Sequence, residues 1–475
     1  MKRSVLASVV VLAGFLSACA DEVVQPEVAT PALARAAERA HPGHLVQFDG
    51  GVPADFEARV TALGGEVNFV VESAGFASVS GLDGRSAAKL CAGRGVSAVF
   101  PDVQVQLNTP RSVVSVPDVT GGVQSVANPA AALLFATQWN MRVVRADVAW
   151  AANQLGSPDV TVAILDTGID YNGLDMNGVV DLTRSRSFVP SDSAYLASTP
   201  FAFRLLFDDL NGHGTNVAAQ VATNGTAFAG VNSKTTLLSV KVLGRTGSGS
   251  LGGILAGLVW AADQGADVAN VSIGIPGGVR KSQLGPRVNG LTNRVINYAN
   301  QRGMVIVVAA GNDGANLDED GGGLVRSYCN APHVVCVSAT GPTASANLLF
   351  GPWLNQDALA PYSNYGEQVM VSAPGGSNFG LILSVCARLT VQPGVDGAPD
   401  TFPCLGGGSV VGMAGTSQAA PHVAGLVAKL VEVHGKGNPV AVKEALLESL
   451  DDLGAPGFDP IYGYGRINVG KAFGL

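Results

Sequence analysis

A glycine-rich turn that runs directly into an apolar helix constrains this chain more than any other feature. The stretch is Gly412–Leu426, GMAGTSQAAPHVAGL, and it places Ser417 at or next to the start of the predicted helix. Pro421 is expected in the first helical turn, where backbone N–H groups lack intrahelical partners. Those N–H groups and the helix dipole would favour an oxyanion formed when a serine attacks a carbonyl. A buried apolar helix entered through a tight turn explains the stretch alone equally well.

The composition indicates a globular protein with a large core. The chain has 475 residues, of which 47% are hydrophobic and 14% are charged. Disorder would require the opposite balance. The net charge is −8, and no basic stripe is visible, so nucleic acid is not expected as a partner. No apolar run long enough to span a membrane follows residues 1–20.

The N-terminus predicts export. A positive start, Met1-Lys-Arg-Ser, precedes the apolar stretch Val5–Leu16, so residues 1–20 are interpreted as a signal peptide. Leu16-Ser-Ala-Cys19 resembles a bacterial lipoprotein box, whereas Ala18-Cys-Ala20 fits ordinary signal cleavage. Under either alternative the protein is secreted or held at the cell envelope, and a lipid on Cys19 would be its only link to a membrane. Residues 21–42 are expected to be a tether.

The cysteines fit an exported protein. Cys329 and Cys336 are close in sequence, as are Cys386 and Cys404, so two local disulfides are expected. Cys91 is left over and is interpreted as a buried apolar residue. The sequence lacks the C-x-x-C spacing of a zinc site, so no metal is assigned.

Residues 43–107 predict a small α+β domain of their own. The pattern reads strand, helix, strand, strand, helix, strand, which is the ferredoxin-like order. The expected elements are His44–Phe48, a helix containing Phe56, Val60 and Leu63, then Val67–Val71, Phe76–Val79, Ala87–Cys91 and Val96–Leu107. Residues 108–137 show no clear periodicity and are interpreted as a linker that can be cut.

Residues 138–475 predict an α/β domain with a mainly parallel sheet flanked by helices, because strands and helices alternate along them. A nearly continuous β run, Val160–Leu165, ends on Asp166, at the position where open α/β sheets bind ligands. His213 stands at the start of an apolar helix, and Asn312 follows the strand Val305–Ala310. Each residue alone also has an ordinary explanation as a cap, a structural histidine or a turn former.

Together these residues form a catalytic set. Ser417 would attack a carbonyl and His213 would take its proton, while Asp166 orients the imidazole and stabilises its charged form. Asn312 and the Ser417 N–H would hold the oxyanion. The residues occur in the order Asp, His, Ser, which is the order found in subtilisin.

Several stretches resemble the subtilisin-like serine proteases. "AILDTGID", "NGHGTNVA", "GADVANVSIG", "VVAAGND", "GTSQAAPHVAGLVA" and "GYGRINVGKA" carry the resemblance, which spans residues 138–474. It implies a triad of Asp166, His213 and Ser417, with Asn312 at the oxyanion hole. It also implies protein or peptide substrates and no cofactor for the chemistry. Two segments would pair with an extended substrate as an added strand: Gly247-Ser248-Gly249 and Ser272-Ile273-Gly274.

Residues 43–107 also resemble the propeptide of these proteases, through Val99-Phe-Pro-Asp-Val-Gln-Val105. The resemblance implies a precursor that processes itself. The propeptide would assist folding and then act as an intramolecular inhibitor until it is cut within residues 107–137.

The chain departs from the family's usual motifs. Gln418 follows the serine where Met is usual, and Asn216 replaces the second His of H-G-T-H. Gly173-Leu-Asp-Met stands where His-Pro-Asp-Leu is common. None of these positions belongs to the triad, so the changes are expected to affect pocket shape and fine geometry. His422, on the nucleophile helix, is expected to be structural.

Other interpretations are weighed against this one. Calcium is common in the family, and five acidic residues are potential ligands, but without ligand-loop spacing they are interpreted as surface residues: Asp175, Asp208, Asp209, Asp318 and Asp320. Gly247–Gly252 matches G-x-G-x-x-G, which suggests dinucleotide binding. That motif also requires an acidic residue at the end of the next strand, and Asp267 instead precedes the strand. A non-catalytic module on the same scaffold is the third alternative, and the intact set of four residues argues against it.

Overall fold

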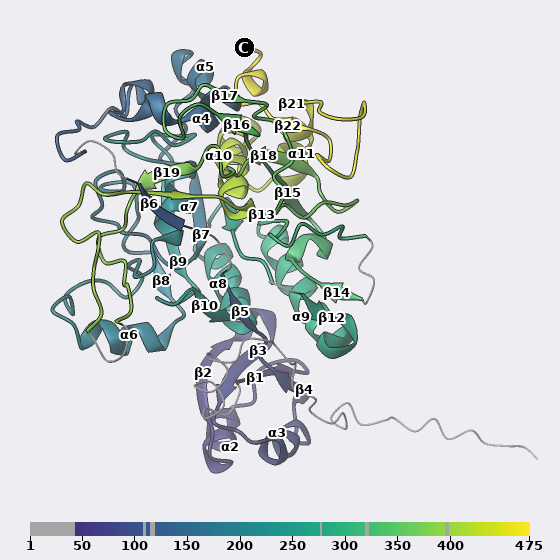
Figure 1. Ribbon diagram of the computed structural model, residues 1–475. Helices are drawn as coiled ribbons and strands as arrows, with labels where there is room; N and C mark the ends of the chain where they lie inside the picture. Colours follow the sequence, from purple (N-terminus) through teal and green to yellow (C-terminus); the bar gives the residue numbers. More distant parts are fainter. Residues whose placement is uncertain (1–42, 108–110, 115–118, 276–277, 319–322, 395–398) are drawn as a thin grey trace, which may run out of the picture. The chain divides into compact units, whose positions relative to one another are not determined.

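The computed structural model describes residues 43–107, 111–114, 119–275, 278–318, 323–394 and 399–475 (Figure 1). The chain divides into two compact units, residues 1–102 and 103–475. The predicted signal peptide and tether lie outside the described residues. Within the ranges given above, the structure has no helix that is long and apolar enough to span a membrane.

The first unit is the small α+β domain that the sequence predicts. Four antiparallel strands lie in the order β2-β3-β1-β4. The apolar sides of its strands and helices form one core around Val46, Phe56 and Leu90. The expected last strand ends early, at Pro101. The elements are β1 (His44–Phe48), α2 (Phe56–Ala62), β2 (Glu66–Val71), β3 (Phe76–Ser80), α3 (Gly84–Cys91) and β4 (Val96–Pro101).

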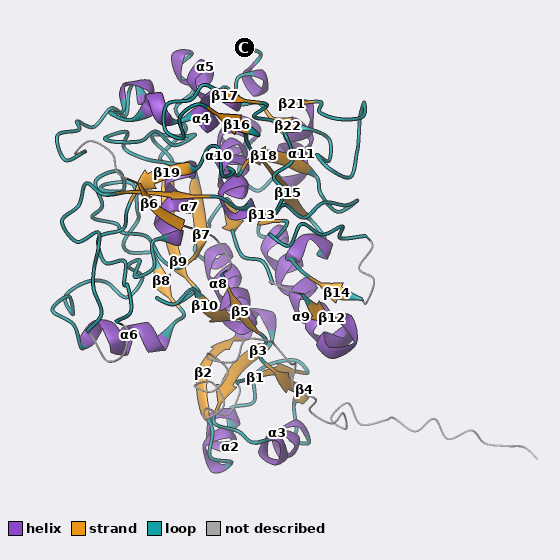
Figure 2. Ribbon diagram, viewed as in Figure 1, coloured by secondary structure: helices purple, strands orange, loops and turns teal. Residues whose placement is uncertain are grey.

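The second unit is built on a nine-stranded sheet, drawn in orange in Figure 2. All neighbouring strands are parallel except the last two, so the predicted mainly parallel α/β fold is confirmed. In sheet order the strands are β8 (Arg186–Ser187), β9 (Thr236–Lys241), β7 (Thr161–Asp166), β11 (Val268–Val271), β13 (Val305–Ala309), β15 (Val334–Thr340), β18 (Val371–Pro374), β22 (Arg466–Ile467) and β21 (Leu450–Asp451).

Helices cover both faces of this sheet. Side chains alternate along a strand, so Ile164 and Leu165 of β7 face opposite sides. Ile164 joins the core that contains Val217 and Val423, from α7 (His213–Val221) and α10 (Thr416–His434). Leu165 faces Gly257 of α8 (Leu251–Asp263). The remaining helices are α4 (Trp139–Val143), α5 (Ala146–Ala151), α6 (Pro190–Ala197), α9 (Lys281–Gln301) and α11 (Pro439–Glu448).

Short strands complete the second unit. Two of them come from the segment after the first unit, β5 (Gln104–Gln106) and β6 (Arg111–Val114). β5 pairs antiparallel with β10 (Ser248–Ser250). β6 pairs antiparallel with β20 (Val410–Met413), which also pairs with β19 (Ile382–Val385). The other two ribbons join β12 (Val279–Arg280) to β14 (Leu324–Val325), and β16 (Ala344–Ser345) to β17 (Trp353–Leu354).

Much of the segment interpreted as linker packs into the second unit. Val119, Ala132 and Leu134 are buried there, and two short 3-10 helices form at Pro129–Ala131 and Phe135–Thr137. Apolar residues without helix or strand periodicity can still fill a core, so periodicity alone missed this packing.

Both expected disulfides are present. Cys329 is bonded to Cys336 and Cys386 to Cys404, with Cα–Cα distances of 5.2 and 5.9 Å. Cys91 is buried, as expected, but the interpretation that it is left over was wrong, because it is disulfide-bonded as well. The disulfides agree with an oxidising compartment.

Candidate active site

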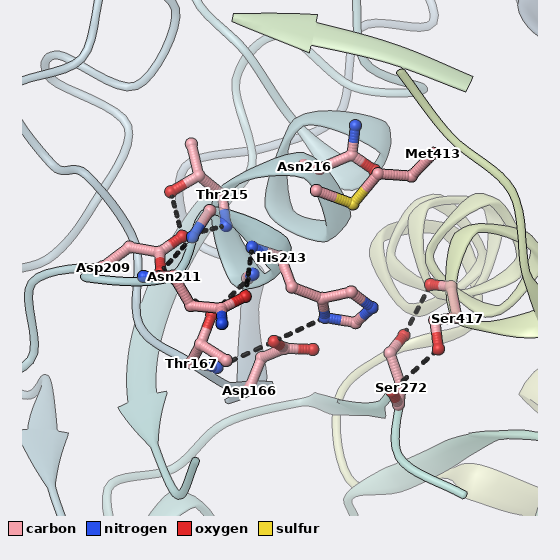
Figure 3. Close-up of polar contacts among 12 residues, drawn as sticks. Asp166, Thr167, Asp209, Asn211, His213, Thr215, Asn216, Ser272, Met413 and Ser417 are labelled. Carbon is pink, nitrogen blue, oxygen red and sulfur yellow. Dashed lines mark hydrogen bonds and ion pairs between the residues drawn. The ribbon is translucent and has the colours of Figure 1, made fainter. Parts of the chain in front are cut away.

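Asp166 and His213 form a buried pair at the sheet edge. Asp166 is the last residue of β7 and His213 is the first residue of α7. Asp166 Oδ1 lies 2.7 Å from His213 Nδ1 and also accepts a hydrogen bond from the Thr167 N–H at 2.7 Å. His213 Nε2 is buried, has no partner in the described part of the chain, and lies on the side of the ring that faces Ser417 (Figure 3). The pair is therefore oriented to take a proton from the direction of Ser417.

Two features allow Asp166 and His213 to approach. Gly214 has no side chain, and a Cβ atom there would overlap the Gly168 carbonyl oxygen. Asp209 is fully buried, and its carboxylate accepts hydrogen bonds from the Thr167 hydroxyl at 2.9 Å and from the Thr215 hydroxyl at 2.7 Å. It also accepts the backbone N–H groups of Asn211, Gly212 and Thr215. Asp209 therefore joins the loop after Asp166 to the turn before His213.

The interpretation of the aspartates as surface residues was wrong for three of them. Asp175, Asp208 and Asp209 are each at most 2% exposed. Asp175 accepts the backbone N–H groups of Ala227 and Phe228, and burial raises its pKa to about 7. Asp318 is exposed, as expected, and Asp320 lies outside the described residues. Within the described ranges, no group of three or more His, Cys, Asp or Glu residues could hold a metal ion.

Ser417 is the second residue of α10, at the predicted helix start. Pro421 lies inside the helix and not in its first turn. Because proline has no N–H, it cannot donate to the Ser417 carbonyl four residues before it. Ser272 replaces that donor: its hydroxyl donates to Ser417 O at 2.8 Å, and the Ser417 hydroxyl donates to Ser272 O at 3.0 Å (Figure 3). Pro421 thereby leaves the Ser417 carbonyl free to accept the hydrogen bond from Ser272.

Asn312 lies beside the same helix terminus. Its Oδ1 atom accepts both the N–H and the hydroxyl of Thr416, each at 2.8 Å. These bonds turn the amide oxygen towards the helix, so Nδ2 is the end of the amide that can donate elsewhere. That orientation is the one an oxyanion donor requires.

The two segments predicted to pair with a substrate, residues 247–249 and 272–274, lie in different surroundings. Ser248 and Gly249 lie in β10 and pair with Gln106 and Val105. The Gly247 carbonyl accepts the N–H of Leu107 at 2.9 Å. An extended strand of the chain itself thus occupies the edge predicted for a substrate. Of the second segment, Ser272 bonds to Ser417 as above, Ile273 is buried, and Gly274 is partly exposed beside Gly311.

A cavity of about 210 Å³ adjoins this strand. Val105 is 3% exposed and forms part of its wall. The rest of the wall is mostly apolar and includes Leu251, Ile275, Val288 and Tyr328. The cavity could therefore receive an apolar side chain from an extended peptide.

Sequence reasoning missed Lys241, at the end of β9. It is fully buried, and its ammonium group donates to Thr167 O at 2.5 Å and pairs with Asp192 at 3.0 Å. The available signal was a lysine among the apolar residues of Thr236–Lys241, because a charge buried with such a strand must be paired.

The Cys386–Cys404 loop packs on the His213 side of the site. Arg388 from this loop binds Asp170 through Nε and a terminal nitrogen, at 2.9 and 2.7 Å. Burial would raise the pKa of Asp170, but its bonds to Arg388 and the charge of Arg204 hold the pKa below its usual value. The N–H of Val391 also donates to Leu210 O at 2.9 Å, just before the His213 turn.

His422 has the structural role expected of it. It is fully buried, its Nδ1 donates to Gln418 O at 2.7 Å, and its Nε2 accepts from Asn140 at 2.8 Å. Burial lowers its pKa to about 4, which keeps the ring neutral.

A buried Asp–His pair that faces a serine at the edge of a parallel α/β sheet is typical of one class of protein, the serine hydrolases. Comparison with known proteins specifies the family. Residues 157–465 match the family model of the subtilase family. The chain is 33% identical over 325 residues to the thermophilic serine proteinase of Bacillus sp. strain AK1, covering 68% of this chain and 63% of that protein. It is 30% identical to subtilisin Savinase of Lederbergia lenta, over 70% of this chain and 97% of that protein.

A solved structure agrees in fold. The epidermin leader peptide processing serine protease of Staphylococcus aureus superposes with a TM-score of 0.66 at 22% identity, covering 91% of this chain and 98% of that one. The family match and the two related proteases show that the chain belongs to the subtilase family and is a subtilisin-like serine endopeptidase. The dinucleotide alternative was wrong, because Ser248–Ser250 form a strand and not a phosphate-binding turn.

Proposed function

We propose that this chain is an exported serine endopeptidase in which Asp166, His213 and Ser417 form the triad. The observation that carries the proposal is the 2.7 Å contact between Asp166 and His213, with Nε2 of the imidazole turned towards Ser417. Asn312 Nδ2 and the Ser417 N–H would stabilise the oxyanion.

The chemistry follows from these positions. The Ser417 hydroxyl leaves its bond to Ser272 O and gives its proton to His213 Nε2 as Oγ attacks the peptide carbonyl. His213 then donates this proton to the leaving amine as the C–N bond breaks, which leaves an acyl ester on Ser417. Water, deprotonated by His213, hydrolyses the ester and restores the hydroxyl. Asp166 stabilises the imidazolium throughout.

A serine-reactive phosphonate tests the assignment. The probe should label processed wild-type protein and should not label Ser417→Ala. Ser449→Ala is a matched control, because Ser449 is also buried in the second unit and donates a hydrogen bond there, to the Leu446 carbonyl. Wild-type protein that folds and is not labelled would instead favour a non-catalytic module.

The substrate is proposed to bind as an extended strand along β10. The strand β5 supports this, because it already pairs with Ser248–Ser250 in antiparallel register. An apolar side chain at the position of Val105 would be preferred, since it would contact the cavity walled by Leu251 and Ile275. A peptide library should show this preference, and Leu251→Asp should remove it without changing labelling by the phosphonate. A library profile that is insensitive to Leu251→Asp would contradict this pocket.

We infer further that the precursor cuts itself between Leu107 and Arg111. Two strands of one segment support this narrower range: Gln104–Gln106 pairs with β10, and Arg111–Val114 pairs with β20, the strand that leads to Ser417. We place the cut between these two strands because one pairs with the proposed substrate edge and the other pairs with the strand that leads to Ser417. Residues 43–107 are proposed to assist folding and to inhibit the enzyme until this cut.

Mass spectrometry of the secreted product tests the cut. The mature N-terminus should fall within residues 108–111, and Ser417→Ala protein made in a protease-free host should lose only its signal peptide. Normal processing of Ser417→Ala would refute self-cleavage, and a mature N-terminus outside residues 108–111 would refute the position. The same spectra would show whether Cys19 of the precursor carries a lipid, which decides between the two export alternatives.

A further inference from the structure

Two of the chain's departures from the usual family motifs are in contact. Asn216 lies one turn after His213 on α7, and Gln418 directly follows Ser417 on α10 (Figure 3 shows Asn216, His213 and Ser417). Both side chains are fully buried, and Gln418 Nε2 donates to Asn216 Oδ1 at 3.2 Å. The helix that carries the proposed base is therefore joined to the helix that carries the proposed nucleophile, next to both reacting residues.

Asn216 extends this contact to the strands before Ser417. Its Nδ2 donates to the Ser384 hydroxyl at 2.9 Å and to Ile382 O at 3.3 Å. Both residues lie in β19, which pairs with β20, and β20 leads into α10. A closed circuit therefore runs from α7 to β19 and β20 by hydrogen bonds, along the chain from β20 into α10, and back to α7 through the Gln418–Asn216 bond.

A second contact repeats the first one turn further along both helices. Gln220 follows Asn216 by four residues, and His422 follows Gln418 by four. Asn140 of α4 bridges them, donating to Gln220 Oε1 at 3.1 Å and to His422 Nε2 at 2.8 Å. We call Asn216–Gln418 the first rung and Gln220–Asn140–His422 the second rung of a neutral amide ladder between α7 and α10.

We propose that Asn216 and Gln418 are positioning residues that set the separation of His213 and Ser417, an inference that rests on the proposed function. None of the described hydrogen bonds of these two side chains reaches His213 Nε2 or Ser417 Oγ, so each acts through its neighbour on the same helix. The first rung fixes the two helix starts, whereas the second rung stabilises the helix pair a turn away from the reaction. A misplacement of about 1 Å at a reacting group can cost about a hundredfold in rate.

The test compares single and double variants of the first rung. Gln418→Met and Asn216→Leu each leave the partner amide buried without its bond, so kcat for a fluorogenic peptide should fall by about tenfold to a hundredfold, with KM within about twofold. The double variant should lose less than the product of the single losses, because no amide is then left unpaired. Precursors that process slowly are cut by added wild-type enzyme before the measurement.

Asn140→Leu in the second rung is the matched control. It should lower the thermal midpoint about as much as Gln418→Met does, yet leave kcat within twofold. If Gln418→Met leaves kcat within twofold while lowering the midpoint, or if the losses multiply in the double variant, the positioning role is overturned. An equal loss of kcat in Asn140→Leu would also overturn it. Should Asn216→Leu fail to fold, Asn216→Ala replaces it. An inactive wild-type enzyme would instead refute the proposed function.

Discussion

The two supports of the active site are built from different chemistry. On the His213 side, charged groups hold the loops: the buried Asp209, the buried Lys241–Asp192 pair, and buried Asp170 with the partly exposed Arg388. Between α7 and α10, by contrast, the described contacts of the ladder are neutral. Loops lack regular backbone bonds, so a carboxylate that accepts several N–H groups satisfies them. Helices already satisfy their backbone, so an amide contact is enough to set their separation.

The strongest test of this comparison is Asp209→Asn. The amide has the same shape but presents an NH₂ group to the donors around it, so buried N–H and O–H groups lose their acceptor. A buried donor that loses its acceptor costs about 1–3 kcal/mol. We expect urea unfolding to show a loss in this range, with much reduced peptidase activity. Asp318→Asn is the control, since this exposed carboxylate accepts only the Glu367 N–H in the described contacts. Equal effects of the two substitutions would contradict a special role for the buried carboxylate.

Gly214→Ala tests the same loop contact by sterics alone. The added methyl group would overlap Gly168 O and push the start of α7 away from Asp166. Overpacking of this kind costs about 2–3 kcal/mol, and displacement of His213 should lower kcat/KM by roughly a hundredfold. Gly290→Ala, in α9, meets open space and should be neutral. Full activity in Gly214→Ala would show that the start of α7 can shift without displacing His213 from Asp166.

The sequence was sufficient for the elements that end at the site. The apolar pattern runs up to Asp166 and begins again near His213 and Ser417, so β7, α7 and α10 could be placed from periodicity. Asp209, Lys241 and the first rung could not be found in this way. Their partners lie far away in sequence, and a buried polar residue is recognised only when its tertiary partners are known. The same limit explains why Cys91 was misassigned, since spacing showed no partner.

Arg388→Leu tests the charged support at its outer edge. Asp170 would keep Arg204 and the backbone N–H of residue 388 but lose the two bonds from the Arg388 side chain. Because Arg388 is partly exposed, we expect a loss of only about 2–3 kcal/mol near neutral pH. The folded-state pKa of Asp170 lies below its unfolded value of 3.8, so its stabilising contribution is present above that pH and is lost as the pH falls. The gap between wild type and variant should therefore narrow below pH 4. A gap that is constant with pH would mean that Arg388 acts through packing of the Cys386–Cys404 loop.

In the neutral ladder, the group that makes stability depend on pH is a buried histidine and not a carboxylate. Burial lowers the pKa of His422 from 6.5 to about 4, so the folded ring stays neutral where the unfolded ring takes up a proton. Stability from this group is full above pH 6.5 and is lost as the pH falls towards 4, by at most about 2 kcal/mol between pH 7 and pH 5. His422→Gln removes the titrating group and keeps an acceptor for Asn140. The variant's unfolding free energy should therefore change less over this interval than that of wild type. Burial raises the pKa of both Asp175 and Asp208 to about 7, but these groups titrate in both proteins. The difference in slope therefore isolates His422 even if the variant is less stable at every pH. If the unfolding free energies of wild type and variant changed equally with pH, the ladder would tolerate a charge on His422. The contrast between the charged and the neutral support would then be wrong.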